Sequence, residues 1–185
     1  MRRIRATLDK LRCNKMAVAC PDCKERLEAA GIETVSIYEL MAPVFEAQPE
    51  NRKVLTIHDP CKARSNAPMQ EAVRTLIKKS GYRLAEPDNS RKKTKCCGRG
   101  AGGLVEYADT GWSEKYTAER CMELGGDFVT YCANCRETLR GGGLEGIHVL
   151  DLLFGDAEIT KVKDSLTAKE RMENQKKAKL LLQSM

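Results

Sequence analysis

The stretch FVTYCANCRETLRGGGLEGIHVLDLLFG, residues 128–155, repeats an earlier stretch of the same chain, MAVACPDCKERLEAAGIETVSIYELMAP, residues 16–43. Aligned without gaps, seven of the 28 positions are identical, and both copies carry a Cys-x-x-Cys motif at the same place. A repeat at this separation indicates a duplicated half-module rather than a solenoid. In each copy an apolar run before the motif predicts a buried strand, and the residues after it predict a helix, a second short strand and a second helix.

The residues between the two copies predict the remaining elements. The β-branched run Val54–Ile57 predicts a strand, and a helix follows it with Asn66 as its N-terminal cap. Tyr82–Ala85 predicts another strand, and Trp112–Leu124 predicts a helix that ends at two glycines. Strands that alternate with helices in this way favour a small layered α/β fold with a mainly parallel sheet.

Composition limits the classes of protein to which this chain can belong. Its 185 residues are 42% hydrophobic and 31% charged, which is typical of a globular chain and not of a disordered one. No apolar run approaches the roughly 18 residues of a membrane span, and the basic N-terminus lacks the features of a secretory signal. The net charge of +6 and 5% aromatic residues, without a recognition motif, do not favour nucleic-acid binding. We therefore expect a cytoplasmic protein whose nine cysteines stay reduced and serve metal binding or redox chemistry.

Five of the cysteines form a regular pattern. The gap from the first of them to the Cys-Cys pair is 34 residues, as is the gap from that pair to the Cys-x-x-Cys motif. We expect three loops at the carboxyl edge of the sheet to bring these thiols together, because ligands commonly bind at that edge. Thiolates suit iron–sulfur clusters and zinc, and five of them exceed the four ligands of a structural zinc site, which favours several irons. The five candidate ligands are Cys61, Cys96, Cys97, Cys132 and Cys135.

At these residues the sequence resembles the CCG domain, the cysteine-rich domain found in heterodisulfide reductase. His58-Asp59-Pro60-Cys61, Cys96-Cys97-Gly98 and Cys132-Ala133-Asn134-Cys135 match the three parts of the family's motif. The resemblance implies that the five cysteines bind a noncubane 4Fe–4S cluster for electron transfer or disulfide reduction. It also implies that the protein is a component of an oxidoreductase complex, with flavoprotein and ferredoxin-type subunits as partners and a disulfide as a candidate substrate.

The family normally carries two complete motifs, and this sequence departs from that pattern. Its first copy starts at the last third of the motif, so Cys20 and Cys23 have neither the motif's upstream partner cysteine nor a Cys-Cys-Gly segment. They are weaker candidates for metal ligands, and a reaction that needs two facing clusters is in doubt. The expected parts are a truncated first CCG half-module at 1–48, a complete CCG domain at 49–155 and a charged C-terminal helical tail at 156–185.

Other functions remain open at this point. Cys20 and Cys23 after a strand are also typical of a thiol–disulfide oxidoreductase, and zinc could stabilise an interaction module that holds no cluster. Residues 98–103 match G-x-G-x-x-G, although they follow a basic loop rather than a strand, which disfavours nucleotide binding. We expect Cys13 and Cys121 to be buried, inert thiols on helices.

Two further groups of residues invite a functional interpretation. His58 and Asp59 are adjacent, so their side chains face opposite ways on a strand and do not form a ready triad with Cys61. We expect them to shape the turn that leads to that cysteine. The basic residues Arg91, Lys92, Lys93 and Lys95 lie before the Cys-Cys pair and could attract an acidic partner or an anionic substrate, although such a run is usually solvated.

Overall fold

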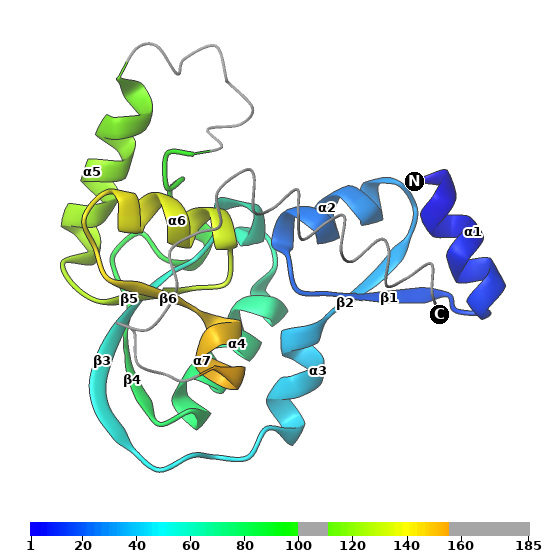
Figure 1. Cartoon of the computed structure of the whole chain (residues 1–185), viewed down its shortest axis with the longest axis horizontal. Coiled ribbons are helices and arrows are strands. Elements are labelled where there is room, and N and C mark those ends of the chain that lie inside the picture. Colours follow the sequence, from blue (N-terminus) through cyan, green and yellow to red (C-terminus); the bar gives the residue numbers. More distant parts are fainter. Residues whose placement is uncertain (100–110, 156–185) are drawn as a thin grey trace.

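The computed structural model describes residues 1–99 and 111–155, and it has the expected α/β architecture (Figure 1). The helices are α1 (Arg2–Leu11), α2 (Pro21–Ala29), α3 (Ile37–Val44), α4 (Ala67–Lys79), α5 (Trp112–Leu124), α6 (Ala133–Gly141) and α7 (Val149–Phe154), with short 3-10 turns η1 (Cys61–Ala63) and η2 (Arg91–Lys93). The strands are β1 (Lys15–Val18), β2 (Glu33–Ser36), β3 (Asn51–His58), β4 (Tyr82–Ala85), β5 (Phe128–Thr130) and β6 (Gly146–His148). The expected C-terminal helix, and most of the glycine-rich segment, lie outside the described residues.

Four strands form the central sheet in the order β4-β3-β5-β6, and every pair is parallel. Its two faces are covered by different helices because neighbouring residues on a strand point to opposite sides. Val129 belongs to the core cluster that contains residues of α3, α4 and α7, whereas Phe128 packs with residues of α5 and α6. The sheet is thus buried between two layers of helices, as parallel sheets usually are.

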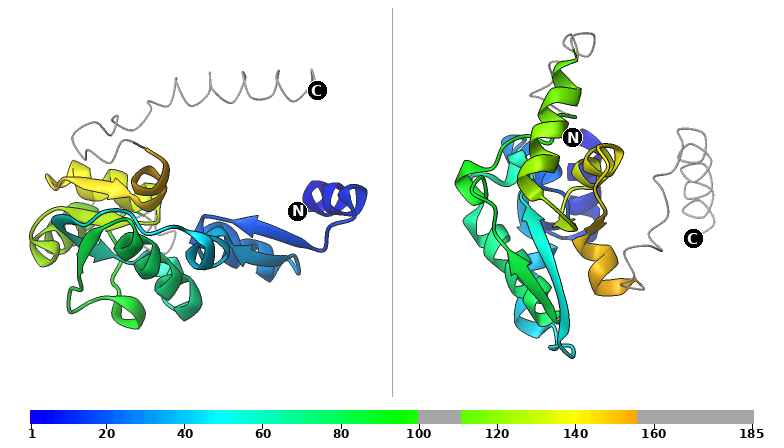
Figure 2. Two further views of the ribbon diagram at one scale, coloured as in Figure 1. Left: turned by 90° about the horizontal axis from the view of Figure 1, so that it is seen from below. Right: turned by 90° about the vertical axis from the view of Figure 1, so that its left-hand side faces the viewer.

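The two copies of the repeat adopt the same order of elements, which confirms the duplication. The first copy forms β1, α2, β2 and α3, and the second forms β5, α6, β6 and α7. Strand β1 pairs with β2 in parallel, but these two form a sheet of their own instead of joining the central one. Figure 2 shows this first copy extending to one side of the four-stranded sheet.

Helix caps place both Cys-x-x-Cys motifs at the start of a helix. Cys20 is the N-cap of α2 and Cys132 is the N-cap of α6. The helices that end the two copies are capped in related ways, because the backbone N–H of Tyr38 donates to the Ser36 hydroxyl and that of Leu150 donates to His148 Nδ1. The two caps occupy equivalent positions in the repeat, and they fix where each copy turns from strand to helix.

Within the described residues, no helix is both long and apolar enough to cross a membrane.

Candidate metal centre

Three loops at the carboxyl edge of the central sheet carry the five cysteines. Strand β3 ends at His58, and Cys61 follows in η1. The neighbouring strand β5 ends at Thr130, and Cys132 and Cys135 follow at the start of α6. The Cys96–Cys97 pair comes from the loop after η2. The topology therefore brings together the segments that the spacing of the cysteines predicts.

Hydrogen bonds between thiols join all five cysteines in one series. Cys61 is bonded to Cys96, and Cys96 is bonded to its neighbour Cys97. Cys97 is in turn bonded to Cys135, which is bonded to Cys132. Cys97 and Cys135 are buried, and the other three are partly accessible. Thiols that are separated by up to 74 positions in the sequence, from 61 to 135, thus form a single cluster, which we call the five-thiol cluster.

The pKa values of these thiols differ strongly across the cluster. The hydrogen bond with Cys96, followed by burial, raises the pKa of Cys61 far above that of a free thiol. Bonds to Cys132 and Cys97 likewise raise the pKa of Cys135. In contrast, the hydrogen bond from Cys135 and the backbone N–H groups at the start of α6 outweigh burial and lower the pKa of Cys132 to about 6. Cys132 therefore ionises more readily than Cys61, Cys97 or Cys135, and the negative charge lies at a helix N-terminus that stabilises it.

This arrangement fits a multi-iron centre. Crowded thiols resist joint ionisation because their negative charges repel, and a bound cation reverses that balance by binding the thiolates. Within residues 1–99 and 111–155, no group of three or more His, Cys, Asp or Glu side chains is arranged to hold a metal ion. The number of soft ligands, five where one tetrahedral ion uses four, is what favours several metal ions over one.

A buried carboxylate, Asp59, fixes the cysteine loops relative to one another. Its side chain is fully buried and accepts two hydrogen bonds from the Arg74 guanidinium of α4, at 3.1 and 2.7 Å. It also accepts one from the Tyr131 hydroxyl and one from the backbone N–H of Arg91, each at 2.7 Å. Burial raises the pKa of Asp59, but these bonds, led by Arg74, lower it more, and the carboxylate stays charged. One residue thus connects the segments that precede Cys61, Cys96 and Cys132.

Arg74, Tyr131 and Thr94 did not emerge from the sequence. Arg74 is 3% exposed, and it also donates to the Glu86 carboxylate at 2.5 Å. The Thr94 hydroxyl donates to the backbone oxygen of Asp59 at 2.6 Å, which ties the approach to the Cys96–Cys97 pair to the end of β3. The sequence signal that could have revealed the ion pair is Arg74 itself, in the middle of the apolar face of its helix. Arginine is rarely buried without a partner, so this position predicts a buried acidic residue beside it.

Gly98 is required by its surroundings. Its φ is +105°, and a Cβ at this position would lie 2.6 Å from the Thr117 hydroxyl and 2.7 Å from the Ser113 backbone oxygen on α5. The Thr117 hydroxyl also donates to the Cys97 oxygen at 2.9 Å. The third residue of Cys-Cys-Gly therefore lets the pair dock against α5. Only the first two residues of the G-x-G-x-x-G stretch are described, so the remainder of that pattern lies outside the described residues.

His58 and Asp59 behave as expected at the turn toward Cys61 and do not form a triad with it. Asp59 binds Arg74 rather than His58. The Nε2 atom of His58 is buried and has no hydrogen-bond partner within the part of the chain that the structure describes. Burial lowers the pKa of His58 to about 4, so the imidazole is neutral at physiological pH.

The other cysteines lie in different surroundings. Cys20 and Cys23 are hydrogen-bonded to each other at the start of α2, and the structure leaves them outside the five-thiol cluster. Cys121 is partly buried on α5, with Sγ 3.6 Å from the Leu139 backbone oxygen. The expectation of a buried Cys13 on a helix is wrong, because α1 ends at Leu11 and buries none of its own residues, and the thiol that follows it is exposed.

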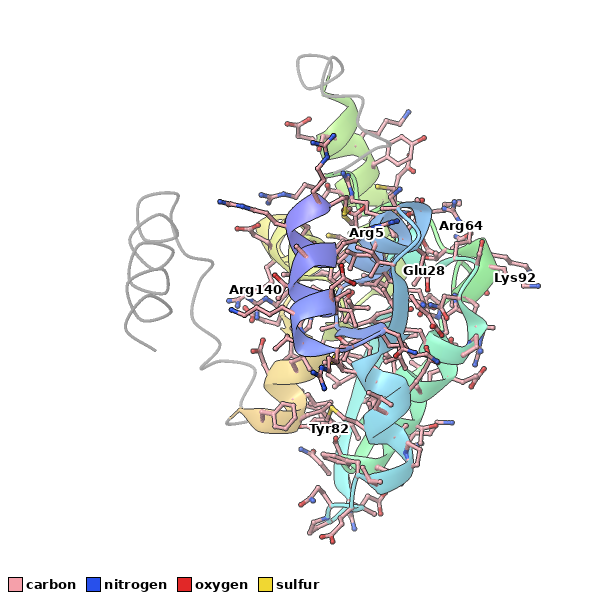
Figure 3. All side chains as sticks on the ribbon, turned by 90° about the vertical axis from the view of Figure 1, so that its right-hand side faces the viewer. Arg5, Glu28, Arg64, Tyr82, Lys92 and Arg140 are labelled. Carbon is pink, nitrogen blue, oxygen red and sulfur yellow. The ribbon has the colours of Figure 1, made fainter. Side chains whose placement is uncertain are left out.

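A pocket of about 700 Å³ opens beside the five-thiol cluster, between α2 of the first copy of the repeat and the loop that follows η1. One wall is a face of α2 with Lys24 and Glu28, and the other is the loop after η1 with Arg64. Figure 3 labels Glu28 and Arg64 on these walls. Cys61 and Cys96 also line the pocket, so two thiols of the cluster can be reached from solvent.

The basic residues before the Cys96–Cys97 pair differ in their surroundings. Arg91 is held in place, since its side chain pairs with Glu71 and its backbone N–H binds Asp59. Lys92, Lys93 and Lys95 are exposed. Only these three lysines of the loop are therefore available to a partner at the surface near the Cys96–Cys97 pair.

Comparison with known proteins agrees with the cysteine pattern. No curated protein and no solved structure matches the chain. A family model does match, and the matched segment contains all five cysteines of the cluster together with Asp59 and Arg74. Residues 55–140 match the model of the CCG family, described as a cysteine-rich domain and typical of iron–sulfur proteins.

Proposed function

We propose that the five-thiol cluster binds an iron–sulfur cluster, of the noncubane 4Fe–4S type, and that the protein serves as an iron–sulfur subunit of an oxidoreductase. The observation that carries this proposal is the unbroken series of thiol contacts from Cys61 to Cys132, which joins three loops at one edge of the sheet. A structural zinc site would use at most four of these thiols and leave one without a role.

The protein's own residues perform three tasks in this proposal. The five cysteines hold the metal, and the start of α6 stabilises negative charge on Cys132. The Asp59–Arg74 pair fixes the positions of the loops that carry the cysteines. When bound, the iron–sulfur cluster supplies one-electron transfer and a site where a sulfur atom can bind iron. The pocket beside Cys61 and Cys96 gives a substrate or a partner access to that site.

The resemblance to heterodisulfide reductase suggests the partners. We propose that a flavoprotein and a ferredoxin-type subunit exchange electrons with this chain in the cytoplasm, and that a disulfide is its substrate. The exposed Lys92, Lys93 and Lys95 support an acidic docking partner, because long-range attraction between opposite charges speeds association.

Visible absorption and electron paramagnetic resonance of the anaerobically purified protein test the proposal. We expect a broad visible absorbance that a low-potential reductant bleaches, and its loss in Cys97→Ser. Cys121→Ser is the matched control, since Cys121 lies near the cluster on α5 without belonging to it. A colourless protein, after anaerobic handling and attempted reconstitution with iron and sulfide, would contradict the proposal and leave a zinc module or a plain thiol protein.

A further inference from the structure

The start of α2 presents two thiols in contact with each other. Cys20 is the N-cap and is partly accessible, while Cys23 lies one turn later and is exposed. The backbone N–H of Cys23 donates to the Cys20 sulfur at 3.3 Å, and the two thiols are hydrogen-bonded to each other.

This pair differs from its counterpart in the second copy. Cys132 and Cys135 continue into a series of five thiols, whereas Cys20 and Cys23 are hydrogen-bonded to each other and not to a thiol of that series. Among the described residues, no third His, Cys, Asp or Glu completes a metal site around them. Two adjacent thiols have a redox chemistry of their own, because they can be oxidised together to a disulfide.

Tyr38 provides the second observation. Its side chain is fully buried, and its hydroxyl has no hydrogen-bond partner within the described residues. The hydroxyl is close enough to Cys20 and to Cys132 for both sulfurs to act on it electrostatically. Figure 1 shows why, since α2 and α6 turn their N-terminal ends toward each other.

We propose that Cys20 and Cys23 form a thiol–disulfide exchange site, separate from the five-thiol cluster, whose substrate is a low-molecular-weight disulfide. The Cys20 thiolate attacks one sulfur of that disulfide, which breaks its S–S bond and releases the first thiol. The Cys23 sulfur then attacks the Cys20 sulfur of the mixed disulfide, releases the second thiol and closes the Cys20–Cys23 bond. The protein loses two electrons and two protons, and the two product thiols carry them away.

The site is accessible to such a substrate. Cys23 is exposed, and the side chains next to it on α2 are polar, including Asp22 and Arg26, which form an ion pair at 2.8 Å. Cys13 offers an internal comparison, because it is also exposed but its Sγ lies 3.5 Å from a backbone oxygen, of Leu11, rather than beside a second thiol.

The test uses the full chain in anaerobic buffers of reduced and oxidised glutathione at graded ratios. Free thiols are alkylated, the protein is digested, and mass spectrometry quantifies each cysteine. We expect Cys20 and Cys23 to convert together and reversibly to an intramolecular disulfide, at ratios where Cys13 is still mostly reduced. In Cys20→Ser, Cys23 should form only a mixed disulfide with glutathione, as Cys13 does.

Two outcomes would overturn the proposal. One is that Cys20 and Cys23 oxidise no more readily than Cys13 and never form a bond with each other. The other is that a metal occupies the pair and protects both thiols until a chelator removes it. The iron content of Cys20→Ser is measured in parallel. Iron equal to that of the unmodified protein shows that either result is independent of the five-thiol cluster.

Discussion

The hydrogen bonds around Asp59 allow a quantitative prediction. Arg74→Met removes the guanidinium that donates to this carboxylate at 3.1 and 2.7 Å, while the methionine still fills much of the same space between α4 and the sheet. Asp59 then remains fully buried with a negative charge that only Tyr131 and the backbone N–H of Arg91 offset. Removing one partner of a buried ion pair typically costs about 3–5 kcal/mol, and we expect a loss of this size in the free energy of unfolding.

Urea unfolding followed by far-UV circular dichroism measures this loss. Lys15→Ala is the matched control, because the Lys15–Glu33 pair has both side chains more than half exposed, at 54% and 57%, and such pairs contribute less than about 1 kcal/mol. The double variant Asp59→Asn with Arg74→Met should lose less stability than the sum of the two single variants, since it leaves no buried charge unpaired. An Arg74→Met loss no larger than that of Lys15→Ala, or strict additivity in the double variant, would refute the reasoning.

Two further predictions concern stability. Gly98→Ala should cost at least about 2 kcal/mol and reduce metal loading, because the φ of +105° is strained for alanine and the new Cβ would lie 2.6 Å from the Thr117 hydroxyl. Gly126→Ala, where a Cβ meets nothing within 4 Å, should leave the urea midpoint unchanged, and equal losses in both variants would contradict the explanation. Burial lowers the pKa of His148 to about 4, below its unfolded value of about 6.5, so the contribution of His148 to stability should fall by up to about 3 kcal/mol as the pH drops between these values, beside a similar contribution from His58. His148→Asn keeps an acceptor for the Leu150 N–H and should weaken this pH dependence, and an unchanged dependence of the urea midpoint on pH would exclude His148 as a cause.

Local signals in the sequence predicted most of the fold. The repeat placed Cys20 and Cys132 at helix caps, and the residues Asn66 and Ser36 mark helix starts because their side chains accept from the backbone of the first turn. The separate sheet of the first copy was not predictable in this way. Periodicity shows that a segment is a strand, but it does not show which strand will lie beside it.

The candidate site likewise has features that the sequence predicts and features that depend on tertiary packing. The grouping of Cys61, Cys132 and Cys135 followed from their positions after strands that share one edge of the sheet, and the equal spacing of the motif added the Cys96–Cys97 pair. The contact between Asp59 and Arg74 did not, because it joins residues 15 positions apart on different elements and depends on how α4 packs against β3. The exposure of Cys13 was also missed, since a helix that ends two residues before it cannot be distinguished by composition from one that continues.

Metal analysis of the anaerobically purified protein tests the central claim most directly. Iron, acid-labile sulfide and zinc are measured per chain in the unmodified protein, in Cys61→Ser and Cys97→Ser, and in the controls Cys20→Ser and Cys121→Ser. The account predicts about four iron and about four sulfide per chain, lost in the first two variants and retained in both controls. Stoichiometric zinc without sulfide, or iron that persists without Cys61 and Cys97 but disappears without Cys20, would contradict it.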